Sequence, residues 1–409
     1  MRVAYVVSRF PHVSETFIVR ELDAVSASGE IDVELFSLFA PVDPIVHPAA
    51  ERWLARLHRG GRRRALAGLG FWLARRPVRT SSSIAQIVRA FRRRPDLMAR
   101  SLVAFAIGAG HAATIRRLRI EHVHAHFASY PALAAWTIWR LTGVGYSFTA
   151  HAHDIYVDRS FLAPLLRDAR FAVPISDYNR RLMERYDAVG TPLHVVHCGV
   201  DPDRYAYAPR TLPSTGPVRM LCVASLQEYK GHRFLLDALA RGGPGLDRVE
   251  LDLVGRGELR AQLERRTAQL GLGDRVRFHG GLTEPEVAAL LARADIFVLP
   301  SIVVERTGFM EGIPVSLMEA MAVGVPVVTS RISGIPELVR DGETGLLVEP
   351  ADSAALAAAI SRVIGEGEAT APRLDAARAL VEAQFDLRAS GLAMSSLIAA
   401  QAPAAAAAR

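Results

Sequence analysis

The chain has 409 residues, half of them hydrophobic and 22% charged, which is typical of a globular protein with a substantial interior. This length exceeds one ordinary hydrophobic core, so we expect two domains. The two cysteines, Cys198 and Cys222, exclude a disulfide framework and favour a reducing cytoplasm. We expect neither a secretory signal nor a membrane-spanning helix, because the nearest candidate, residues 102–115, is short and contains His111.

Short apolar runs alternate with longer helical patterns along the chain, which predicts an α/β fold with parallel sheets. A turn-rich stretch at 208–217 separates two such halves and is typical of a linker. The strands expected before it are 3–7, 33–38, 122–125, 146–150, 171–175 and 194–197. The strands expected after it are 219–224, 250–254, 276–279, 296–299, 325–329 and 345–348.

This rhythm predicts two doubly wound, Rossmann-like domains. We expect an N-terminal domain over residues 1–207, a linker at 208–217 and a C-terminal domain over 218–385. Residues 386–409 are expected to form a helix that packs back on the N-terminal domain, followed by a frayed tail. Ligands of such sheets bind outside the carboxyl ends of the strands, so we expect the site in a cleft between the domains.

The formal net charge of +7 is concentrated in residues 51–100, which contain 14 arginines and two acidic residues. Large apolar side chains are mixed with these arginines, and this mixture predicts a basic amphipathic surface on an anionic membrane. A solvated charged face is the alternative, and we expect no nucleic-acid partner. The apolar members are Trp53, Leu54, Leu57, Leu66, Leu69, Phe71, Trp72 and Leu73.

The only lysine among the 49 cationic residues is Lys230. A lysine meets a phosphate as a compact point charge, whereas an arginine presents a planar fork. One lysine retained in so biased a composition therefore favours a phosphate-binding role for this position. Chance escape from the compositional bias is the alternative.

Residues 311–326 contain the most informative motif. Gly312 and Pro314 are typical of a tight turn that opens a helix, with Pro314 at the first helical position, and Gly324 ends that helix. The amides and the positive end of the helix dipole favour an anion. Glu311 precedes the helix and Glu319 lies inside it, so their carboxylates are placed to bind hydroxyls at opposite ends of one ligand. A turn-forming Glu311 and a solvent-facing Glu319 are the alternative.

With these residues the chain resembles glycosyltransferase family 4, whose members have the two-domain GT-B fold, over nearly its whole length. The matching motifs are Glu-x7-Glu at 311–319, Leu-x3-Lys-Gly at 226–231, Gly-Arg-Gly at 255–257, Gly-Gly at 280–281, Gly-Ile-Pro-Glu at 334–337 and Asp-Gly-x-Thr-Gly at 341–345. Residues 10–18, 196–201 and 311–314 resemble a subgroup that builds bacterial exopolysaccharides such as colanic acid.

The resemblance implies a retaining hexosyltransferase that moves a sugar from a nucleotide-sugar donor to a lipid-linked or growing polysaccharide acceptor at the inner membrane face. It implies that Lys230 neutralises the donor diphosphate, that Glu311 holds hydroxyls of the donor sugar and that Glu319 holds the ribose. It also implies that His151 lies near the reacting sugar, and that no cofactor, metal or covalent sugar–enzyme intermediate is needed. The backbone implied to bind the donor comprises Gly312, Ile313, Pro314, Val315 and Ser316 at the phosphates, and Gly257, Gly280 and Leu282 at the base.

Two positions depart from the pattern of the family. Ser225 stands where an arginine usually supplies a second cation for the diphosphate, and Arg256 or Arg306 are candidates to replace it. The usual glycine-rich first loop is replaced by residues 9–15. Within that loop Arg9, Ser14 and Glu15 are candidates for the acceptor side, while Ser14 as a helix cap is the structural alternative.

Three clusters resemble metal-ligand spacings: His124 with His126, residues 151–154, and Asp201 with Asp203. None is accompanied by a further ligand set, so we expect no metal site. The competing functions are a sugar-nucleotide epimerase of the same fold, a metal-dependent hydrolase built on the histidines and nucleic-acid binding. Conversion of the donor without an acceptor, metal-dependent activity and salt-sensitive retention of nucleic acid would distinguish them.

Overall fold

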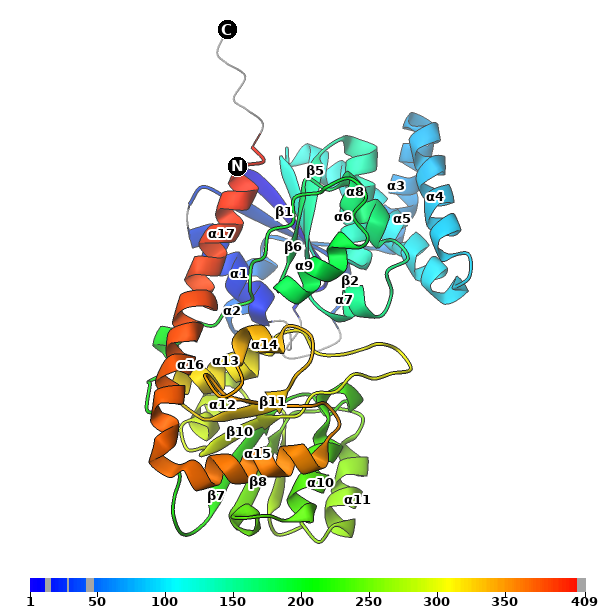
Figure 1. The fold of residues 1–409 in the computed structure, drawn as a ribbon. Coiled ribbons are helices and arrows are strands. Elements are labelled where there is room, and N and C mark those ends of the chain that lie inside the picture. The colour runs from blue at the N-terminus through cyan, green and yellow to red at the C-terminus, as the bar shows by residue number, and fades with distance from the viewer. Residues whose placement is uncertain (12–15, 28, 42–47, 403–409) are drawn as a thin grey trace. The chain divides into compact units, whose positions relative to one another are not determined.

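The computed structural model describes residues 1–11, 16–27, 29–41 and 48–402 (Figure 1). The chain forms two compact units. Unit 1 comprises Met1–His197 and the chain from Leu387, and unit 2 comprises Cys198–Asp386. Each unit contains one six-stranded parallel sheet, which confirms the predicted α/β class.

Unit 1 has the sheet order β3-β2-β1-β4-β5-β6. The chain winds outward from β1 through β2 to β3, returns to β4 beside β1, and continues through β5 to β6. The direction of winding therefore reverses between β1 and β4, and ligands of doubly wound sheets bind at such a switch point. The strands are β1 (Arg2–Arg9), β2 (Asp32–Phe39), β3 (Leu57–Arg59), β4 (His122–His126), β5 (Gly145–Ala150) and β6 (Phe171–Pro174).

The helices of unit 1 cover this sheet and include the last helix of the chain. They are α1 (Thr16–Ala27), α2 (Pro48–Leu54), α3 (Arg62–Arg75), α4 (Pro77–Phe91), α5 (Pro95–Arg117), α6 (Tyr130–Thr142), α7 (His153–Tyr156), α8 (Leu162–Asp168), α9 (Asp177–Glu184) and α17 (Leu387–Ala399). Helix α17 packs on α1 so closely that a side chain at Gly391 would overlap Ala24.

Unit 2 repeats the doubly wound topology with the order β12-β11-β10-β7-β8-β9, and its switch point lies between β7 and β10. Its strands are β7 (Val218–Val223), β8 (Val249–Val254), β9 (Val276–Gly280), β10 (Ile296–Leu299), β11 (Val327–Ser330) and β12 (Leu346–Val348). Its α-helices are α10 (His232–Arg241), α11 (Arg260–Gln269), α12 (Glu284–Leu291), α13 (Val315–Val323), α14 (Ile335–Leu338), α15 (Ser353–Glu366) and α16 (Ala371–Gln384).

Most of the predicted strands are present, and two differences have clear physical causes. Residues 194–197 form no regular strand, although His194 and Val196 donate backbone hydrogen bonds to the edge strand β6. The short strand β3 was not predicted, because its three residues Leu-His-Arg show no strand pattern within the arginine-rich segment.

The predicted linker at 208–217 belongs to unit 2. The backbone amides of Ala208 and Arg210 donate to the carbonyls of Val323 and Gly324, which attaches the start of this stretch to the end of α13. The unit boundary lies instead at His197 and Cys198, ten residues earlier than the sequence pattern suggested.

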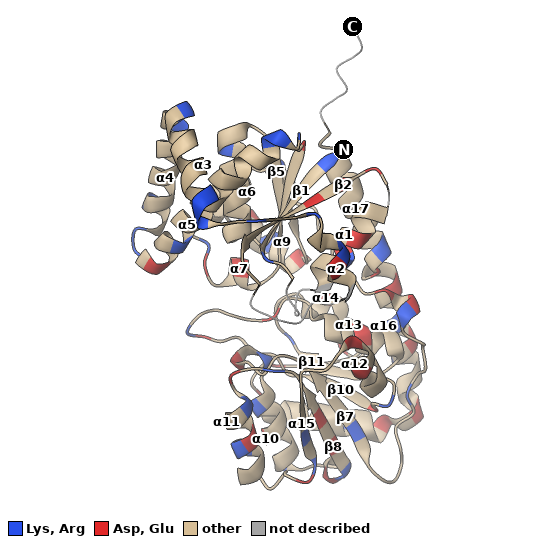
Figure 2. Cartoon of the chain, turned by 180° about the vertical axis from the view of Figure 1, so that it is seen from behind, with Lys and Arg blue, Asp and Glu red and all other residues tan. Residues whose placement is uncertain are grey.

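The arginine-rich segment folds into β3, α3, α4 and the start of α5, where Figure 2 shows clustered basic residues. Trp53 and Trp72 were expected on its surface, but both are buried: Trp53 donates to Asp23 and Trp72 donates to the Ala109 carbonyl. Helix α5 is long and apolar enough to span a membrane, yet half of its most apolar window is buried inside unit 1, as in the core helix of a folded domain.

Candidate active site

The residues expected to bind the donor lie at the carboxyl ends of the strands of unit 2. Lys230 follows β7 in a short 3-10 turn (Glu228–Lys230), and Glu311 follows β10. Since β7 and β10 are neighbours on either side of the switch point, the topology itself brings these two residues together.

Lys230 and Glu311 form an ion pair with their side chains largely buried, at 12% and 14% exposure. Burial is the largest single influence and opposes the charge of Lys230, but Glu311, Tyr229 and Cys222 together outweigh it and raise the pKa of the ammonium above its usual value. The ammonium also lies 5.0 Å from the ring centroid of Tyr229. The site therefore holds a fixed positive charge at neutral pH.

The backbone around Lys230 depends on a glycine. Gly231 has φ +70°, and a Cβ atom there would overlap the carbonyl oxygen of Pro300. The amide of Ile302 donates to the Tyr229 carbonyl at 2.7 Å, so the lysine turn is fixed to the segment that follows β10. Only glycine fits this combination of backbone angle and close approach.

The glycines after β8 allow a similar close approach. A Cβ atom at Gly255 would overlap the Ala224 carbonyl, and one at Gly257 would overlap that of Leu226. The amide of Leu226 donates to the Arg256 carbonyl at 2.9 Å. The segments after β7 and β8 thus run side by side, which places Gly257 beside the segment that leads to Lys230.

Helix α13 begins directly after the turn that contains Glu311. Pro314 is the residue before the helix rather than its first residue, and Gly324 ends the helix at φ +90°. The hydroxyl of Ser333 donates to the carbonyls of Glu311 and Gly312, at 2.6 and 3.0 Å. The first turn of a helix presents backbone amides without intrahelical acceptors, so the Glu311 carboxylate and an anion-binding helix end lie a few residues apart.

Glu319 lies on α13 and is partly exposed. Its carboxylate accepts a hydrogen bond from the hydroxyl of Tyr205 at 2.9 Å. Sequence reasoning missed Tyr205 and Ser333, because the first lies 114 positions from Glu319 and the second lies 22 positions from Glu311. Neither lies in a motif that would have identified it.

Ser225 lies two residues after the end of β7, where the family usually has an arginine. Of the two candidates to replace that cation, Arg306 forms an ion pair with Glu228 at 2.6 Å. Glu228 opens the same short turn that ends at Lys230, and the Arg306 side chain is 71% exposed. Arg256 lies at the side of Gly281. Arg306 is therefore the candidate whose contacts attach it to the lysine turn.

The residues expected at the nucleotide base also gather at this edge. Gly280 ends β9 with φ +75°, its carbonyl accepts from the Gly255 amide at 2.7 Å, and Leu282 packs partly buried against the core of unit 2. Gly257, Gly280 and Leu282 thus line the ends of neighbouring strands β8 and β9.

His151 lies in unit 1, directly after β5. It is buried, with its ring between those of Phe17 and Phe127 at centroid distances of 4.8 and 4.6 Å. Burial, and then the neighbouring His126 and His153, hold the pKa of His151 well below its usual value, so the ring is neutral. The Asn179 amide donates to its backbone carbonyl, which fixes the loop.

The clusters that resemble metal spacings are occupied by other contacts. Both ring nitrogens of His124 hydrogen-bond to hydroxyls, Nδ1 to Ser147 at 2.8 Å and Nε2 to Thr149 at 2.9 Å.

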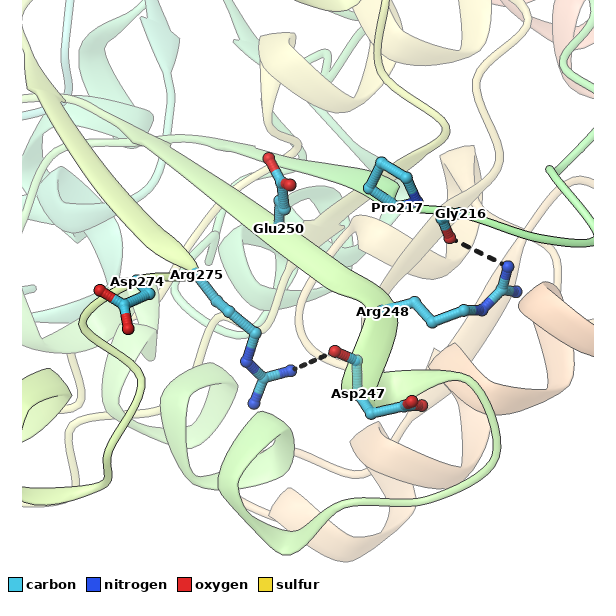
Figure 3. Close-up of a pocket in the computed structure, with 7 residues that line it drawn as sticks. All are labelled: Gly216, Pro217, Asp247, Arg248, Glu250, Asp274 and Arg275. Carbon is cyan, nitrogen blue, oxygen red and sulfur yellow. Dashed lines mark hydrogen bonds between the residues drawn. The ribbon is translucent and has the colours of Figure 1, made fainter.

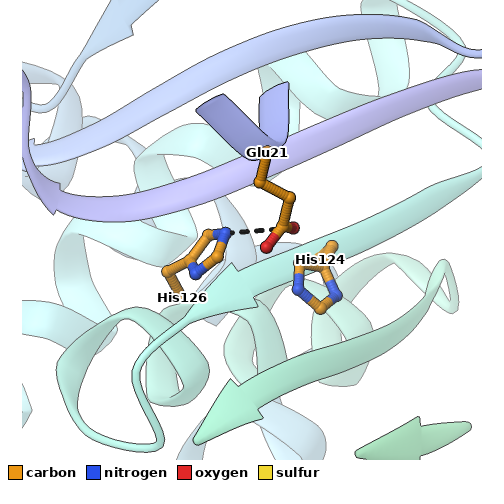
Figure 4. Close-up of side chains that lie close together, drawn as sticks. All are labelled: Glu21, His124 and His126. Atoms are coloured by element: carbon orange, nitrogen blue, oxygen red, sulfur yellow. Dashed lines mark ion pairs between the residues drawn. The ribbon is translucent and has the colours of Figure 1, made fainter. Parts of the chain in front are cut away.

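The Asp154 carboxylate accepts from the backbone amides of residues 128, 151 and 152. Asp201 accepts from the Asp203 amide and opens a short 3-10 turn, as the proline between them predicted. The carboxylate of Glu21 and the rings of His124 and His126 do lie close together (Figure 4).

Arg9 ends β1, where its guanidinium donates to the Ala40 carbonyl at 2.6 Å and lies over the Phe39 ring. It therefore supports the neighbouring end of β2. Ser14 and Glu15, the other residues expected on the acceptor side, lie outside the described residues.

A polar hollow occupies the opposite end of the sheet of unit 2 (Figure 3). Its lining residues are Gly216, Pro217, Asp247, Arg248, Glu250, Asp274 and Arg275. They lie at the amino ends of β7, β8 and β9, away from the ion pair. The guanidiniums of Arg248 and Arg275 donate to backbone carbonyls at 3.1 and 3.2 Å, which ties these loops together. The hollow is therefore a packing feature of the loops.

Comparison with known proteins agrees with this arrangement. The profile described as "Glycosyltransferase Family 4" matches residues 15–204, and that described as "Glycosyl transferases group 1" matches residues 217–366. The chain is 30% identical to the amylovoran biosynthesis glycosyltransferase AmsK of Erwinia amylovora, over 94% of this chain and 96% of that protein. The chain belongs to glycosyltransferase family 4.

Further relatives and structures agree with this membership. The putative colanic acid biosynthesis glycosyltransferase WcaL of Escherichia coli is 30% identical over 97% of this glycosyltransferase and 99% of that protein. The crystal structure of HepE from Anabaena in complex with UDP superposes with a TM-score of 0.71 at 18% identity, covering 98% of this chain and 100% of that one. The predicted GT-B fold is thereby confirmed.

Proposed function

We propose that this glycosyltransferase transfers a hexose from a nucleotide-sugar donor to a lipid-linked or growing polysaccharide acceptor in exopolysaccharide synthesis, with retention of anomeric configuration. The observation that supports this most directly is the Lys230–Glu311 pair at the switch point of unit 2. The relatives named for amylovoran and colanic acid synthesis support the product class, and the neighbours solved with UDP and with UDP-glucose support the donor class.

In the proposed reaction the bond between the anomeric carbon and the donor phosphate oxygen breaks, while the acceptor hydroxyl oxygen bonds to the same face of that carbon. The acceptor proton passes to the departing phosphate oxygen, so charge and atoms balance without a covalent sugar–enzyme intermediate. Lys230 and the amides at the start of α13 stabilise the charge that develops on the diphosphate. Glu311 binds hydroxyls of the donor sugar, Glu319 binds the ribose and His151 contacts the sugar.

A panel of nucleotide sugars, assayed for nucleotide release with a crude lipid extract as acceptor, tests this proposal. We expect one donor to be turned over only when acceptor is present, with retained configuration at the new linkage by NMR. Glu311→Ala should abolish most of the turnover. Conversion of the donor without acceptor would instead indicate an epimerase, and unchanged turnover in Glu311→Ala would refute the assigned site.

The basic segment of unit 1 supports a location on the inner face of the cytoplasmic membrane. Its exposed apolar side chains include Leu66 at 69%, Phe71 at 49% and Val78 at 79% exposure, and Arg62–Arg64 beside them are exposed as well. Apolar side chains flanked by arginines complement an anionic lipid surface. The apolar side chains insert between the lipids, the arginines are attracted to the anionic headgroups, and both effects favour binding.

Sedimentation with vesicles tests this surface. We expect binding to vesicles that contain phosphatidylglycerol, weaker binding to neutral phosphatidylcholine vesicles, and loss of about tenfold in affinity for a Leu66→Asp, Phe71→Asp variant. Leu392→Asp is the matched control, because Leu392 is 62% exposed on α17, outside the basic segment. Equal losses in both variants would indicate that the basic segment is only a solvated face.

A further inference from the structure

Three side chains from three elements of unit 1 form a row that the proposed mechanism does not use. Glu21 lies on α1, His126 ends β4 and His151 follows β5. His126 Nδ1 lies 3.1 Å from His151 Nε2. His126 Nε2 lies 3.3 Å from Glu21 Oε1 (Figure 4). Glu21 and His126 come from the two sides of the switch point between β1 and β4.

The Glu21 carboxylate determines where the first proton of this row lies. Tyr5, which is fully buried, donates its hydroxyl to the same Glu21 oxygen at 3.2 Å. Burial, and then Glu21, raise the pKa of Tyr5 well above its usual value, so this hydroxyl stays protonated and acts as a donor. His126 Nε2 is fully buried and has no hydrogen bond of standard geometry among the described residues, and the Glu21 carboxylate lies 3.3 Å from it. A carboxylate accepts only, and it therefore favours a proton on His126 Nε2.

The second proton follows from the first. In a neutral His126 ring, which has one N–H group, a proton on Nε2 leaves Nδ1 as an acceptor, whereas a doubly protonated ring would donate from Nδ1. The nitrogen 3.1 Å from it is His151 Nε2, which must then carry the proton of its own ring. In the neutral His151 ring this makes Nδ1 an acceptor, suited to the hydroxyl of a sugar.

The same residues do not form a complete metal site. Ligand atoms of a tetrahedral zinc site lie about 2.0–2.2 Å from the ion, and the third group here would be His124. Both of its nitrogens are held by the hydroxyls of Ser147 and Thr149. That leaves Glu21 and His126, and two protein ligands are too few to bind zinc tightly.

We propose that His126 is neutral and that Glu21 and His126 are positioning residues that hold His151 in the Nε2–H tautomer, so that His151 meets the donor sugar as a hydrogen-bond acceptor. This inference rests on the proposed function for the role of His151, but the tautomer itself does not. The row acts through His151 alone, because neither Glu21 nor His126 needs to touch substrate.

NMR of protein labelled with 15N-histidine tests the tautomer without any substrate. We expect both His126 and His151 to show the Nε2–H form, with assignments made by single replacement of each histidine. Glu21→Leu removes the acceptor and should let the Nδ1–H form appear at both rings. Glu21→Gln keeps an acceptor oxygen and should change the spectrum less. A doubly protonated His126, or a His151 ring in the Nδ1–H form, in the unaltered protein overturns the proposal.

Kinetics provide the second readout. We expect Glu21→Leu and His126→Phe to lower kcat about tenfold or more while the donor KM changes less than about threefold, because the sugar is bound but wrongly held. Glu21→Gln should retain most of kcat. If Glu21 and His126 were purely structural, the unfolding midpoint would fall in all three variants, and Glu21→Gln would not retain more kcat than Glu21→Leu and His126→Phe. That result also overturns the proposal.

Glu34 and His58 supply the matched control. They form a second carboxylate–histidine pair in unit 1, at 2.8 Å and with similar burial of the carboxylate, but without a link to His151. Glu34→Leu should leave kcat and the His151 signal unchanged. One zinc ion per chain, lost in His126→Phe, would show that a metal fixes the rings instead. If no donor is turned over at all, the proposed function fails while the NMR result still decides the tautomer.

Discussion

The two units share one topology and place opposite chemistry at its switch point. In unit 2 the neighbouring strands β7 and β10 lead to a cation paired with a carboxylate, Lys230 and Glu311, and both side chains keep some exposure. In unit 1 the corresponding strands β1 and β4 lead to Glu21 and to His126, a fully buried ring. Topology therefore locates a site, but the charge and burial of the side chains determine what the site binds.

The strand ends differ in the same way. Gly231, Gly255 and Gly257 of unit 2 lie against backbone carbonyls of neighbouring segments, so side chains do not fit there and these loops pack closely together. The strand ends of unit 1 instead bear histidines stacked against aromatic rings, such as His151 between Phe17 and Phe127. At its strand ends unit 2 thus has closely packed backbone beside a charged pair, and unit 1 has aromatic rings packed around a neutral histidine.

The largest expected effect concerns the cation of unit 2. Lys230→Ala should lower turnover about 10²–10³-fold, because it removes a preorganised positive charge from the departing diphosphate and leaves Glu311 unpaired. Ser225→Ala, five residues earlier, should cost no more than a few-fold. Initial-rate assays with the preferred donor compare the two variants, and equal losses would show that Lys230 has no special role.

The second prediction concerns the backbone beside that lysine. Gly231 and Gly271 have nearly the same φ, +70° and +69°, but only Gly231 is crowded by the Pro300 carbonyl. Replacement of Gly271 by alanine should destabilise unit 2 by about 1–2 kcal/mol, the cost of the left-handed backbone alone. Gly231→Ala should cost about 3 kcal/mol or more and lower turnover as well. Chemical denaturation measures the loss of unfolding free energy in both variants. Similar losses would mean that the contact with the Pro300 carbonyl is relieved at no cost.

The third prediction uses the buried histidines of unit 1. Burial is the main cause that lowers the pKa of His111 to about 4 and that of His122 to about 3. Between pH 6.5 and about 4 the unfolded chain therefore binds more protons than the folded unit, so stability falls as the pH is lowered through this range. Each histidine contributes on the order of 3 kcal/mol at the acidic end of that range.

In unit 2 the described residues include one comparable group, His232. Its pKa is lowered to about 4, mainly by burial and then by the charge of Lys230. Amide hydrogen exchange at pH 5 and pH 8 should therefore show a larger loss of protection in unit 1 than in unit 2. A greater loss in unit 2 at pH 5 would contradict the assignment of neutral, buried histidines to unit 1.

The sequence predicted much of unit 2 because its site is encoded locally. Lys230 with Gly231, and Glu311 with Glu319, lie in short motifs whose glycines and turns have direct physical causes. The structure brings Lys230 and Glu311 together in an ion pair. The strand pattern failed at 194–197 and at β3, where edge strands make few contacts and need little apolar alternation.

Contacts between residues distant in the chain could not be predicted. Glu21 and His126 are 105 positions apart, and the spacing of His124 and His126 suggested a metal because alternate strand residues share a face. The hydroxyls of Ser147 and Thr149 on the neighbouring strand give those rings other partners. Such pairing depends on strand register, which a single sequence does not specify.

The smallest expected effect tests how Glu319, which we propose binds the ribose, is held in unit 2. The Tyr205 hydroxyl donates to Glu319, and Tyr205→Phe removes this bond while the buried ring stays in place. We expect the donor KM to change two- to fivefold with kcat nearly constant, corresponding to about 1 kcal/mol for one hydrogen bond. Tyr207→Phe is the control, because that hydroxyl donates to Asp375 instead. A fall in kcat for Tyr205→Phe at constant KM would mean that Glu319 acts on the transition state, and that it belongs with Lys230 and Glu311 rather than with the groups that only bind the nucleotide.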